Sequence, residues 1–213
     1  MSRKYAIREI FATLQGEGAQ AGSPSVFLRF AGCNLGYDVC PWCDTDWVKA
    51  AYTPDLEGTL ARVQRAAEDG FGSEREGLLL VATGGEPSLQ LDRPLSDALR
   101  LRGYRISMES NGARAVDRSL VDWLTISPKE RAFAQREGEE MKLLFSGTAA
   151  PGITADVDAV RTLAEDTRFA HYFLQPIDLP GRGPNYAETV AAVMELGPPW
   201  RLSVQTHKVT GIP

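Results

Sequence analysis

The chain has 213 residues, of which 43% are hydrophobic and 24% charged, as in ordinary globular proteins. This length supports one substantial core and is short for two domains, so residues 1–213 are expected to form a single domain. Basic residues number 23 and acidic residues 28, and the resulting net charge of −5 argues against nucleic acid as a partner. No apolar run reaches about 18 residues, so no membrane span is expected.

Short apolar or alternating segments predict strands that end in polar or glycine-containing turns. A run such as GLLLVA at 77–82 is typical of a strand covered on both faces. We expect strands at 5–11, 25–30, 77–82, 104–108, 123–126, 141–145, 169–174 and 201–205.

Helical periodicity predicts four helices between these strands. Thr53 would cap the first helix, which would end at residues 69–70, and Pro94 would begin the second. Thr154 would cap the third. The periodic positions are Leu56, Leu60, Val63 and Ala67 in the first helix, Leu91, Leu95, Ala98 and Arg102 in the second, Val157, Val160 and Ala164 in the third, and Tyr186, Val190 and Val193 in the fourth.

Strands that alternate with helices predict βα units and a parallel sheet. About six parallel strands with few helices are too few for a closed eight-fold barrel. We therefore expect an α/β fold, an open partial TIM-like barrel with the cysteine-containing loop after its first barrel strand. Polar residues recur just after the strands, and such folds bind ligands at that edge. These residues lie at 33, 83–86, 109–111, 127–129, 175 and 207.

All three cysteines, Cys33, Cys40 and Cys43, lie in one loop with the spacing C-x6-C-x2-C. Thiolates suit iron–sulfur clusters, zinc or copper. A closed zinc site made by this loop alone would lack one ligand, because the histidines, His171 and His207, are distant in sequence. An odd cysteine count without a signal peptide disfavours a disulfide framework. The spacing leaves open an iron–sulfur cluster, a zinc ion, or incidental or redox thiols.

Other polar residues allow a structural and a functional interpretation. The glycines in TLQGEG (13–18) and GGEP (84–87) could simply form turns, or could bring the backbone close to a ligand. In the second case Glu86 could accept from an ammonium group. His207 could be structural or part of a site. Asp44 and Thr45 could cap backbone groups or offer the oxygen ligands that Mg²⁺ prefers.

The cysteine loop followed by GGEP resembles the radical S-adenosylmethionine superfamily, although the usual spacing there is C-x3-C-x2-C. The longer first gap is compatible with one branch, the 7-carboxy-7-deazaguanine synthases. The segments that resemble this branch occur in order along nearly the whole chain. They are TLQGEG (13–18), FLRFAGCN (27–34), CDTD (43–46), ESNG (109–112), SPK (127–129), QP (175–176) and QTHK (205–208).

The resemblance implies a radical enzyme with an open iron in its cluster. Cys33, Cys40 and Cys43 would bind a [4Fe–4S] cluster, whose free iron takes the amino and carboxylate groups of S-adenosylmethionine. One electron would then cleave the sulfonium to methionine and a 5′-deoxyadenosyl radical. The residues that match the S-adenosylmethionine site are Thr83, Gly84, Gly85, Glu86, Asn111, Ser127, Lys129 and Gln175.

The resemblance also implies the substrate, 6-carboxy-5,6,7,8-tetrahydropterin, which would lose ammonia to give 7-carboxy-7-deazaguanine in queuosine biosynthesis. Thr45, together with Asp44, would hold Mg²⁺ against the substrate. No catalytic residue is expected beyond the cluster and S-adenosylmethionine, with Glu109 and His207 as assisting groups. The candidate substrate-binding residues are Gln15, Glu17, Arg29, Glu109, Asp178, His207 and the terminal carboxylate of Pro213.

Two other functions remain open from the sequence. A glycyl-radical-activating enzyme shares the cluster loop and the GGEP run but acts on a protein substrate. A zinc or iron–sulfur binding module would have no turnover. The family further implies a homodimer with flavodoxin or ferredoxin as electron donor, and free cysteines favour the cytoplasm.

Overall fold

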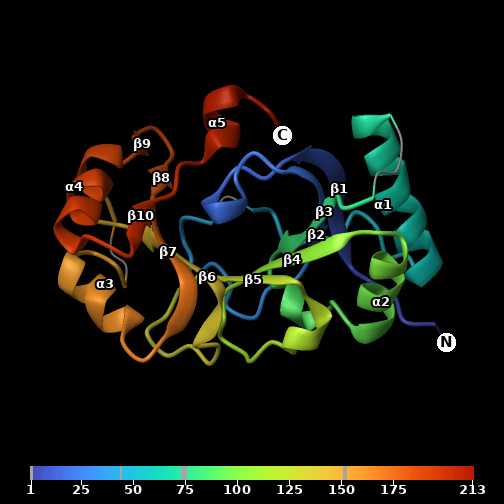
Figure 1. Ribbon diagram of the computed structural model, residues 1–213, viewed down its shortest axis with the longest axis horizontal. Coiled ribbons are helices and arrows are strands. Elements are labelled where there is room, and N and C mark those ends of the chain that lie inside the picture. Colours follow the sequence, from blue (N-terminus) through green and yellow to red (C-terminus); the bar gives the residue numbers. More distant parts are fainter. Residues whose placement is uncertain (1, 44, 73–75, 151–152) are drawn as a thin grey trace.

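The computed structural model describes residues 2–43, 45–72, 76–150 and 153–213 (Figure 1). Its main sheet has eight strands in the order β1-β2-β3-β4-β5-β6-β7-β10. From β2 to β10 every neighbouring pair is parallel, whereas β1 pairs antiparallel to β2. The strands are β1 (Ile7–Leu14), β2 (Pro24–Phe30), β3 (Leu79–Gly84), β4 (Arg105–Ser110), β5 (Trp123–Ile126), β6 (Glu137–Phe145), β7 (Arg168–Pro176) and β10 (Trp200–Leu202).

This architecture confirms the predicted α/β fold with a mostly parallel sheet and few helices. Seven strands run parallel, close to the predicted number, and β10 at the sheet edge corresponds to the strand predicted at 201–205. Within the described residues β1 and β10 each pair with one neighbour, so the sheet stays open. A small second sheet joins β8 (Asp178–Leu179) and β9 (Gly183–Pro184), which the sequence did not predict.

Several predicted strand ends were wrong. β1 continues to Leu14 instead of ending at residue 11, because Leu14 still pairs with Pro24 across the hairpin. β3 extends to Gly84, which is in register with Phe30 of β2. β10 is shorter than predicted, and the chain after it forms the short helix α5 (Thr206–Thr210). Three short 3-10 segments, η1 (Gly18–Gln20), η2 (Pro87–Leu89) and η3 (Arg118–Leu120), were not predicted either.

The first and third helices begin at acidic caps, so Thr53 and Thr154 were wrong as N-caps. Helix α1 (Leu56–Phe71) begins after Asp55, whose side chain accepts from Gly58 N at 3.1 Å. Helix α3 (Val157–Ala164) is capped by Asp156, whereas the Thr154 hydroxyl donates to the Leu144 carbonyl of β6. A carboxylate suits the positive end of the helix dipole better than a hydroxyl does.

The remaining helix boundaries lie close to the prediction. Helix α1 continues past residues 69–70 and ends at Gly72, whose φ of 75° stops it. Helix α2 (Arg93–Leu101) has Asp92 as its cap and proline in its first turn. In α4 (Tyr186–Leu196) the periodic position Val190 is 43% exposed, and Thr189 and Ala192 are buried instead.

Helices pack on the outer face of the curved sheet, with α1 and α2 at one end and α3 and α4 at the other (Figure 1). The core lies between these helices and the outward-facing strand residues. Strand β6 shows the consequence of alternation: Met141 and Leu143 join the core, whereas Lys142 and Leu144 line a cavity on the inner face. The outer face of the sheet thus packs in the core, whereas the inner face presents both polar and apolar side chains to the cavity. No described helix has both the length and the apolar character needed to cross a membrane.

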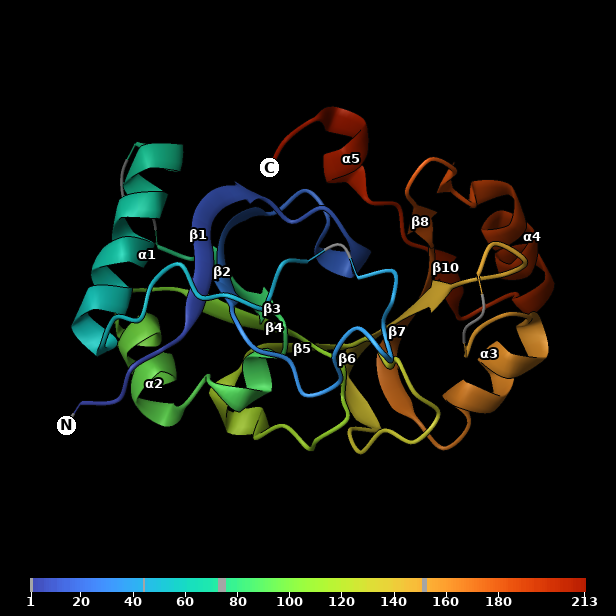
Figure 2. The same ribbon diagram turned by 180° about the vertical axis from the view of Figure 1, so that it is seen from behind.

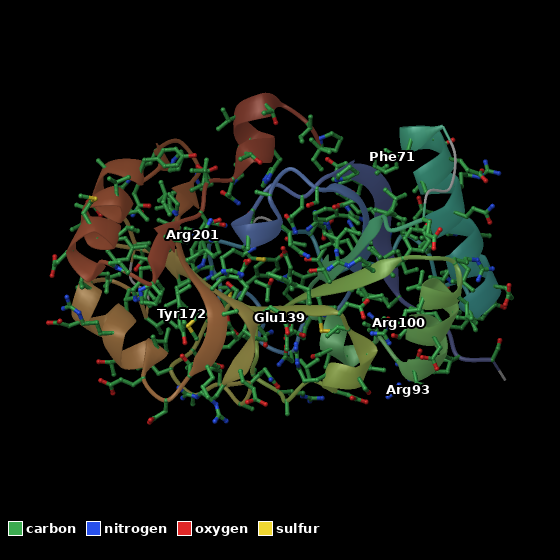
Figure 3. The ribbon with its side chains drawn as sticks, viewed as in Figure 1. Phe71, Arg93, Arg100, Glu139, Tyr172 and Arg201 are labelled. Atoms are coloured by element: carbon green, nitrogen blue, oxygen red, sulfur yellow. The ribbon has the colours of Figure 1, made fainter. Side chains whose placement is uncertain are left out.

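An ion pair supports the junction of η3, β5 and β6. Glu139 of β6, labelled in Figure 3, accepts from Arg118 Nη1 at 2.8 Å and from Leu124 N at 2.7 Å. Burial alone would raise the pKa of Glu139, but these hydrogen bonds and the Arg118 charge lower it.

Candidate active site

A cavity of about 550 Å³ lies at the carboxyl ends of the parallel strands. The long connection between β2 and α1, light blue in Figure 2, supplies part of its wall. The structure brings together nearly all of the residues that the sequence singled out. The predicted residues that line it are Gln15, Glu17, Arg29, Cys33, Cys40, Cys43, Thr45, Thr83, Gly84, Gly85, Glu109, Asn111, Ser127, Lys129, Gln175, Asp178, His207 and Pro213.

Two predicted residues do not appear in this wall. Asp44 lies outside the described residues. Glu86 is only 1% exposed and lies behind the wall, where its carboxylate accepts from Ser110 Oγ and Asn111 N, both at 2.8 Å. It also accepts from Ser88 N at 3.0 Å. These contacts make Glu86 a support for the loop after β4.

The cysteine loop holds three thiols at one side of the cavity. Its turns are closed by Cys40 N donating to Gly36 O at 3.2 Å and by Cys43 N donating to Cys40 O at 3.0 Å. Burial raises the pKa of the Cys40 thiol, the charge of Lys129 opposes this, and Cys43 and Cys33 raise it further. The three thiols line the same cavity, and none of them forms a disulfide.

Within the described ranges, no three His, Cys, Asp or Glu side chains converge as they would around one metal ion. Cys33, Cys40 and Cys43 would nevertheless supply three thiolates, the donors that iron–sulfur clusters take. The cavity wall also contains Trp42, whose buried indole Nε1 lacks a hydrogen-bond partner in the described structure. The donor set thus fits a cluster with an adjacent ligand.

Gly84 and Gly85 attach the cysteine loop to the end of β3. Gly85 N donates to Phe30 O at 3.1 Å, and Glu86 N donates to Gly32 O at 2.9 Å. A Cβ atom at Gly84 would lie 2.2 Å from Phe30 O, and one at Gly85 would lie 2.0 Å from Gly32 O. Gly84 also has a φ of 120°. Glycine is therefore required by the close approach of two backbones.

A buried ion-pair network occupies the inner face of the sheet. Lys142 of β6 pairs with Glu17 and with Glu109 of β4, its Nζ lying 3.3 Å from Glu109 Oε1. Gln205 Nε2 donates to Glu17 Oε1 at 2.8 Å, and Gln15 Nε2 donates to Glu109 Oε1 at 3.0 Å. Burial alone would raise the pKa of Glu17, but the charge and hydrogen bond of Lys142 lower it well below its usual range.

Arg29 of β2 brings a second positive charge to the cavity. Its Nε lies 2.7 Å from Glu9 Oε1, and its Nη1 donates to Thr45 Oγ1 at 3.4 Å. The guanidinium therefore lies between a carboxylate and the hydroxyl that was predicted to bind Mg²⁺. A planar guanidinium can bind a carboxylate through two parallel hydrogen bonds, so this corner suits an anionic ligand group.

Lys129 follows strand β5, and Gln175 lies near the carboxyl end of β7. Lys129 Nζ donates to Ser127 O at 2.9 Å, and burial lowers the pKa of this lysine. Gln175 accepts from Ser203 Oγ at 2.9 Å through its side-chain oxygen. Both side chains thus present polar atoms to the cavity from fixed positions.

The C-terminal segment of the sequence folds back over the 13–18 loop. Thr206 donates to Gly16 O through both its backbone N and its hydroxyl, each at 2.9 Å. His207 packs against Gly16 so closely that a Cβ atom there would lie 2.3 Å from Nδ1. Thr13 Oγ1 donates to Pro213 O at 2.8 Å, and Asp178 accepts from Lys208 at 2.7 Å.

Sequence reasoning missed three residues that hold the site together: Lys142, Gln205 and Ser203. Lys142 carried a usable signal, because it follows Glu140 by two positions and lies between the apolar residues Met141 and Leu143. Charged residues repeated on one face of a buried strand indicate a polar interior. Gln205 and Ser203 carried no such signal, since their roles depend on contacts with residues far away in the chain.

Comparisons with known proteins identify relatives of this chain in sequence and in structure. No family model matches the chain. It is 40% identical to the 7-carboxy-7-deazaguanine synthase of Bordetella pertussis, over 98% of this chain and 99% of that protein. It is 41% identical to the enzyme of the same name from Bradyrhizobium diazoefficiens, again over 98% and 99%. The crystal structure of QueE from Escherichia coli superposes with a TM-score of 0.67 and 29% identity, covering 96% of this chain and 95% of that one. The chain therefore belongs to the 7-carboxy-7-deazaguanine synthase family.

Proposed function

We propose that this protein converts 6-carboxy-5,6,7,8-tetrahydropterin into 7-carboxy-7-deazaguanine with loss of ammonia, as a radical S-adenosylmethionine lyase of queuosine biosynthesis. The observation that carries the proposal is a single cavity whose wall contains two kinds of groups. One is the three thiols, and the other is the Glu17 and Glu109 carboxylates paired with Lys142, together with Arg29. Such a cavity can hold a cluster-bound cosubstrate next to a polar, anionic substrate.

Cys33, Cys40 and Cys43 would hold the [4Fe–4S] cluster, since they are free thiols in one cavity wall. When bound, the cluster supplies the electron that cleaves S-adenosylmethionine to the hydrogen-abstracting radical. The chain's own residues orient the two small molecules. Those proposed for S-adenosylmethionine are Thr83, Gly84, Gly85, Asn111, Ser127, Lys129 and Gln175, with Glu86 supporting Asn111 from behind.

The substrate would lie against the inner face of the sheet. Arg29 would bind its carboxylate, while Glu17 and Glu109 would accept hydrogen bonds from N–H groups of the pterin edge. His207, Asp178 and the main-chain oxygens of Pro213 would complete this side of the site. Thr45 would add Mg²⁺ close to the substrate carboxylate, a role supported by its hard hydroxyl oxygen in the cavity wall.

Three further features belong to the proposal. Residues 1–213 act as one domain, which the single hydrophobic core from Tyr5 to Ala192 supports. The protein works as a homodimer in the cytoplasm, as the family resemblance implies. A flavodoxin or ferredoxin donates the electron.

The test is anaerobic reconstitution with iron and sulfide, followed by incubation with S-adenosylmethionine, a reductant and the carboxytetrahydropterin. A brown protein with about four irons that forms the deazaguanine supports the proposal. One tightly held zinc and no cluster would identify a binding module instead. A loaded cluster that cleaves S-adenosylmethionine but leaves the pterin unchanged would exclude this substrate.

A further inference from the structure

Lys142 is a buried cation in the cavity wall and has no role in the function proposed above. Its side chain is 6% exposed, compared with 14% for Glu17 and 21% for Glu109. Its ammonium joins a carboxylate from the loop after β1 to a carboxylate from β4, and all three groups line the cavity. A lysine inside a barrel is costly unless it is paired, so its presence needs an explanation.

The two carboxylates create the need for this cation. Two buried carboxylates in one pocket repel each other, and one of them would take up a proton at neutral pH. A protonated Glu17 would lose acceptor capacity, whereas an ionised carboxylate offers roughly four lone-pair sites. Lys142 and Gln205 use two of those sites on Glu17, which leaves the others for a ligand.

The groups around Lys142 come from several elements. Glu17, Glu109 and Glu140 raise the pKa of Lys142, although burial alone would lower it. Lys129 adds a positive charge from the loop after β5, and His207 of α5 acts on Glu17. Glu140 caps the N-terminus of η1 by accepting from Ala19 N at 2.8 Å. Lys142 therefore keeps its proton at neutral pH and acts as a fixed charge, so it does not serve as an acid.

We propose that Lys142 is a positioning residue for the pterin: its ammonium pairs with Glu17 and Glu109 and holds both carboxylates in place, so that they accept hydrogen bonds from the substrate's N–H edge. This inference rests on the proposed function, because it assigns partners to that substrate. If Lys142 has this role, its replacement should weaken substrate binding and leave cluster assembly unchanged. The geometry separates the two properties, since Lys142 contacts carboxylates of the inner face and none of its described contacts is a cysteine.

The variants Lys142→Met, Lys142→Arg and Glu17→Gln test this role against the control Lys4→Met. Lys4 is exposed and pairs with Asp55 at 3.6 Å, outside the cavity wall. The measurement is KM for the carboxytetrahydropterin from pH 6 to 9, with iron content and thermal unfolding followed in parallel. Wild type and Lys4→Met should share one KM profile.

In Lys142→Met, burial should raise the pKa of Glu17 toward the values of about 8 known for buried carboxylates. About one tenth of the sites would then be ionised at pH 7, so KM should rise roughly tenfold and fall again toward pH 9. Lys142→Arg keeps the charge and should retain the wild-type profile, including any contribution from His207. Glu17→Gln should raise KM at every pH without the new pH dependence.

The outcomes are separable. A wild-type KM profile in Lys142→Met, or equal losses in Lys142→Met and Lys142→Arg, would overturn the role of the charge. A wild-type KM in Glu17→Gln would overturn it even if Lys142→Met does not fold. If the wild-type protein assembles its cluster, cleaves S-adenosylmethionine and forms no deazaguanine, the proposed function itself fails, and the inference fails with it.

Discussion

Replacing Gly84 by alanine tests whether the close approach of β3 to the cysteine loop is needed for cluster assembly. Gly84 ends β3 with a φ of 120°, and a Cβ atom there would lie 2.2 Å from Phe30 O and 2.5 Å from Phe30 N. Backbone atoms cannot rotate away as a side chain can, so β2 and β3 would have to separate. Phe30 is three residues before Cys33, and the shift would therefore reach the first cysteine.

The matched control is Gly77→Ala, before the start of the same strand. Gly77 has a φ of 82°, but a Cβ atom there would meet nothing within 4 Å. Its cost is the left-handed backbone alone, about 1–2 kcal/mol. Gly84→Ala adds the loss of the hydrogen bonds from Gly85 to Phe30 and from Glu86 to Gly32, about 1 kcal/mol each. We expect a total of about 3–4 kcal/mol, which for a chain of this size lowers Tm by roughly 6–16 °C.

Thermal unfolding of the apoprotein and iron content after anaerobic reconstitution measure the two effects. Gly77→Ala should lose a few degrees of Tm and bind iron as the wild type does. Gly84→Ala should lose more stability and assemble little cluster even well below its Tm. Equal Tm values with full iron in both variants would refute the reasoning, because the backbone contact would then be dispensable.

Three other substitutions probe separate parts of the molecule. Cys40→Ala should abolish cluster assembly, and a full complement of iron after reconstitution would contradict its assignment. Thr45→Ala should keep the cluster but weaken the Mg²⁺ dependence of product formation, and an unaltered dependence would remove Thr45 as a ligand. Glu139→Gln should cost about 1–3 kcal/mol in urea unfolding at pH 7, because it weakens the hydrogen bonds from Arg118 and Leu124. The folded-state pKa of Glu139 is lowered, so its contribution is present above the unfolded value of about 4.3 and is lost as the pH falls through the folded value. The variant should therefore show a shallower acid dependence than the wild type, and identical slopes would count against the role of this carboxylate.

Most of the strands could be predicted because the apolar runs are local and strong. The run LLLVA, for example, needs no distant partner to indicate a buried strand. Helix starts were less predictable. Thr53 and Asp55 are both plausible caps, and the choice depends on which backbone N–H groups each side chain can reach. Helix α5 has five residues, too few for a periodic pattern, and it is positioned by the contact of Thr206 with Gly16.

The residues of the site could be collected from the sequence, because they follow the ends of parallel strands or match family motifs. Their partners could not, since each partner lies far along the chain. Lys142 forms ion pairs with Glu17, which is 125 positions away in the sequence, and with Glu109, which is 33 positions away. Glu86 was predicted to contact S-adenosylmethionine, but the structure buries it behind the loop after β4. This position follows from the pairing of β3 with β4, which the local sequence does not predict.

The open edge of the sheet explains why the side of the cavity proposed to bind the substrate is built from both ends of the sequence. In a closed barrel β1 and β10 would be joined by strand hydrogen bonds, whereas here each is an edge. The loop at 16–18 bridges the gap instead: Gly16 O accepts from Thr206, Glu17 from Gln205, and Gly18 N donates to Ser203 Oγ at 3.1 Å. These few hydrogen bonds fix the positions of the side chains at the open edge. They leave the cavity free, whereas the interior of a small closed barrel is filled by side chains. The same bonds that hold the two edges together therefore orient the carboxylate proposed to bind the pterin, and a change that loosens the C-terminal segment should weaken substrate binding before it affects the cluster.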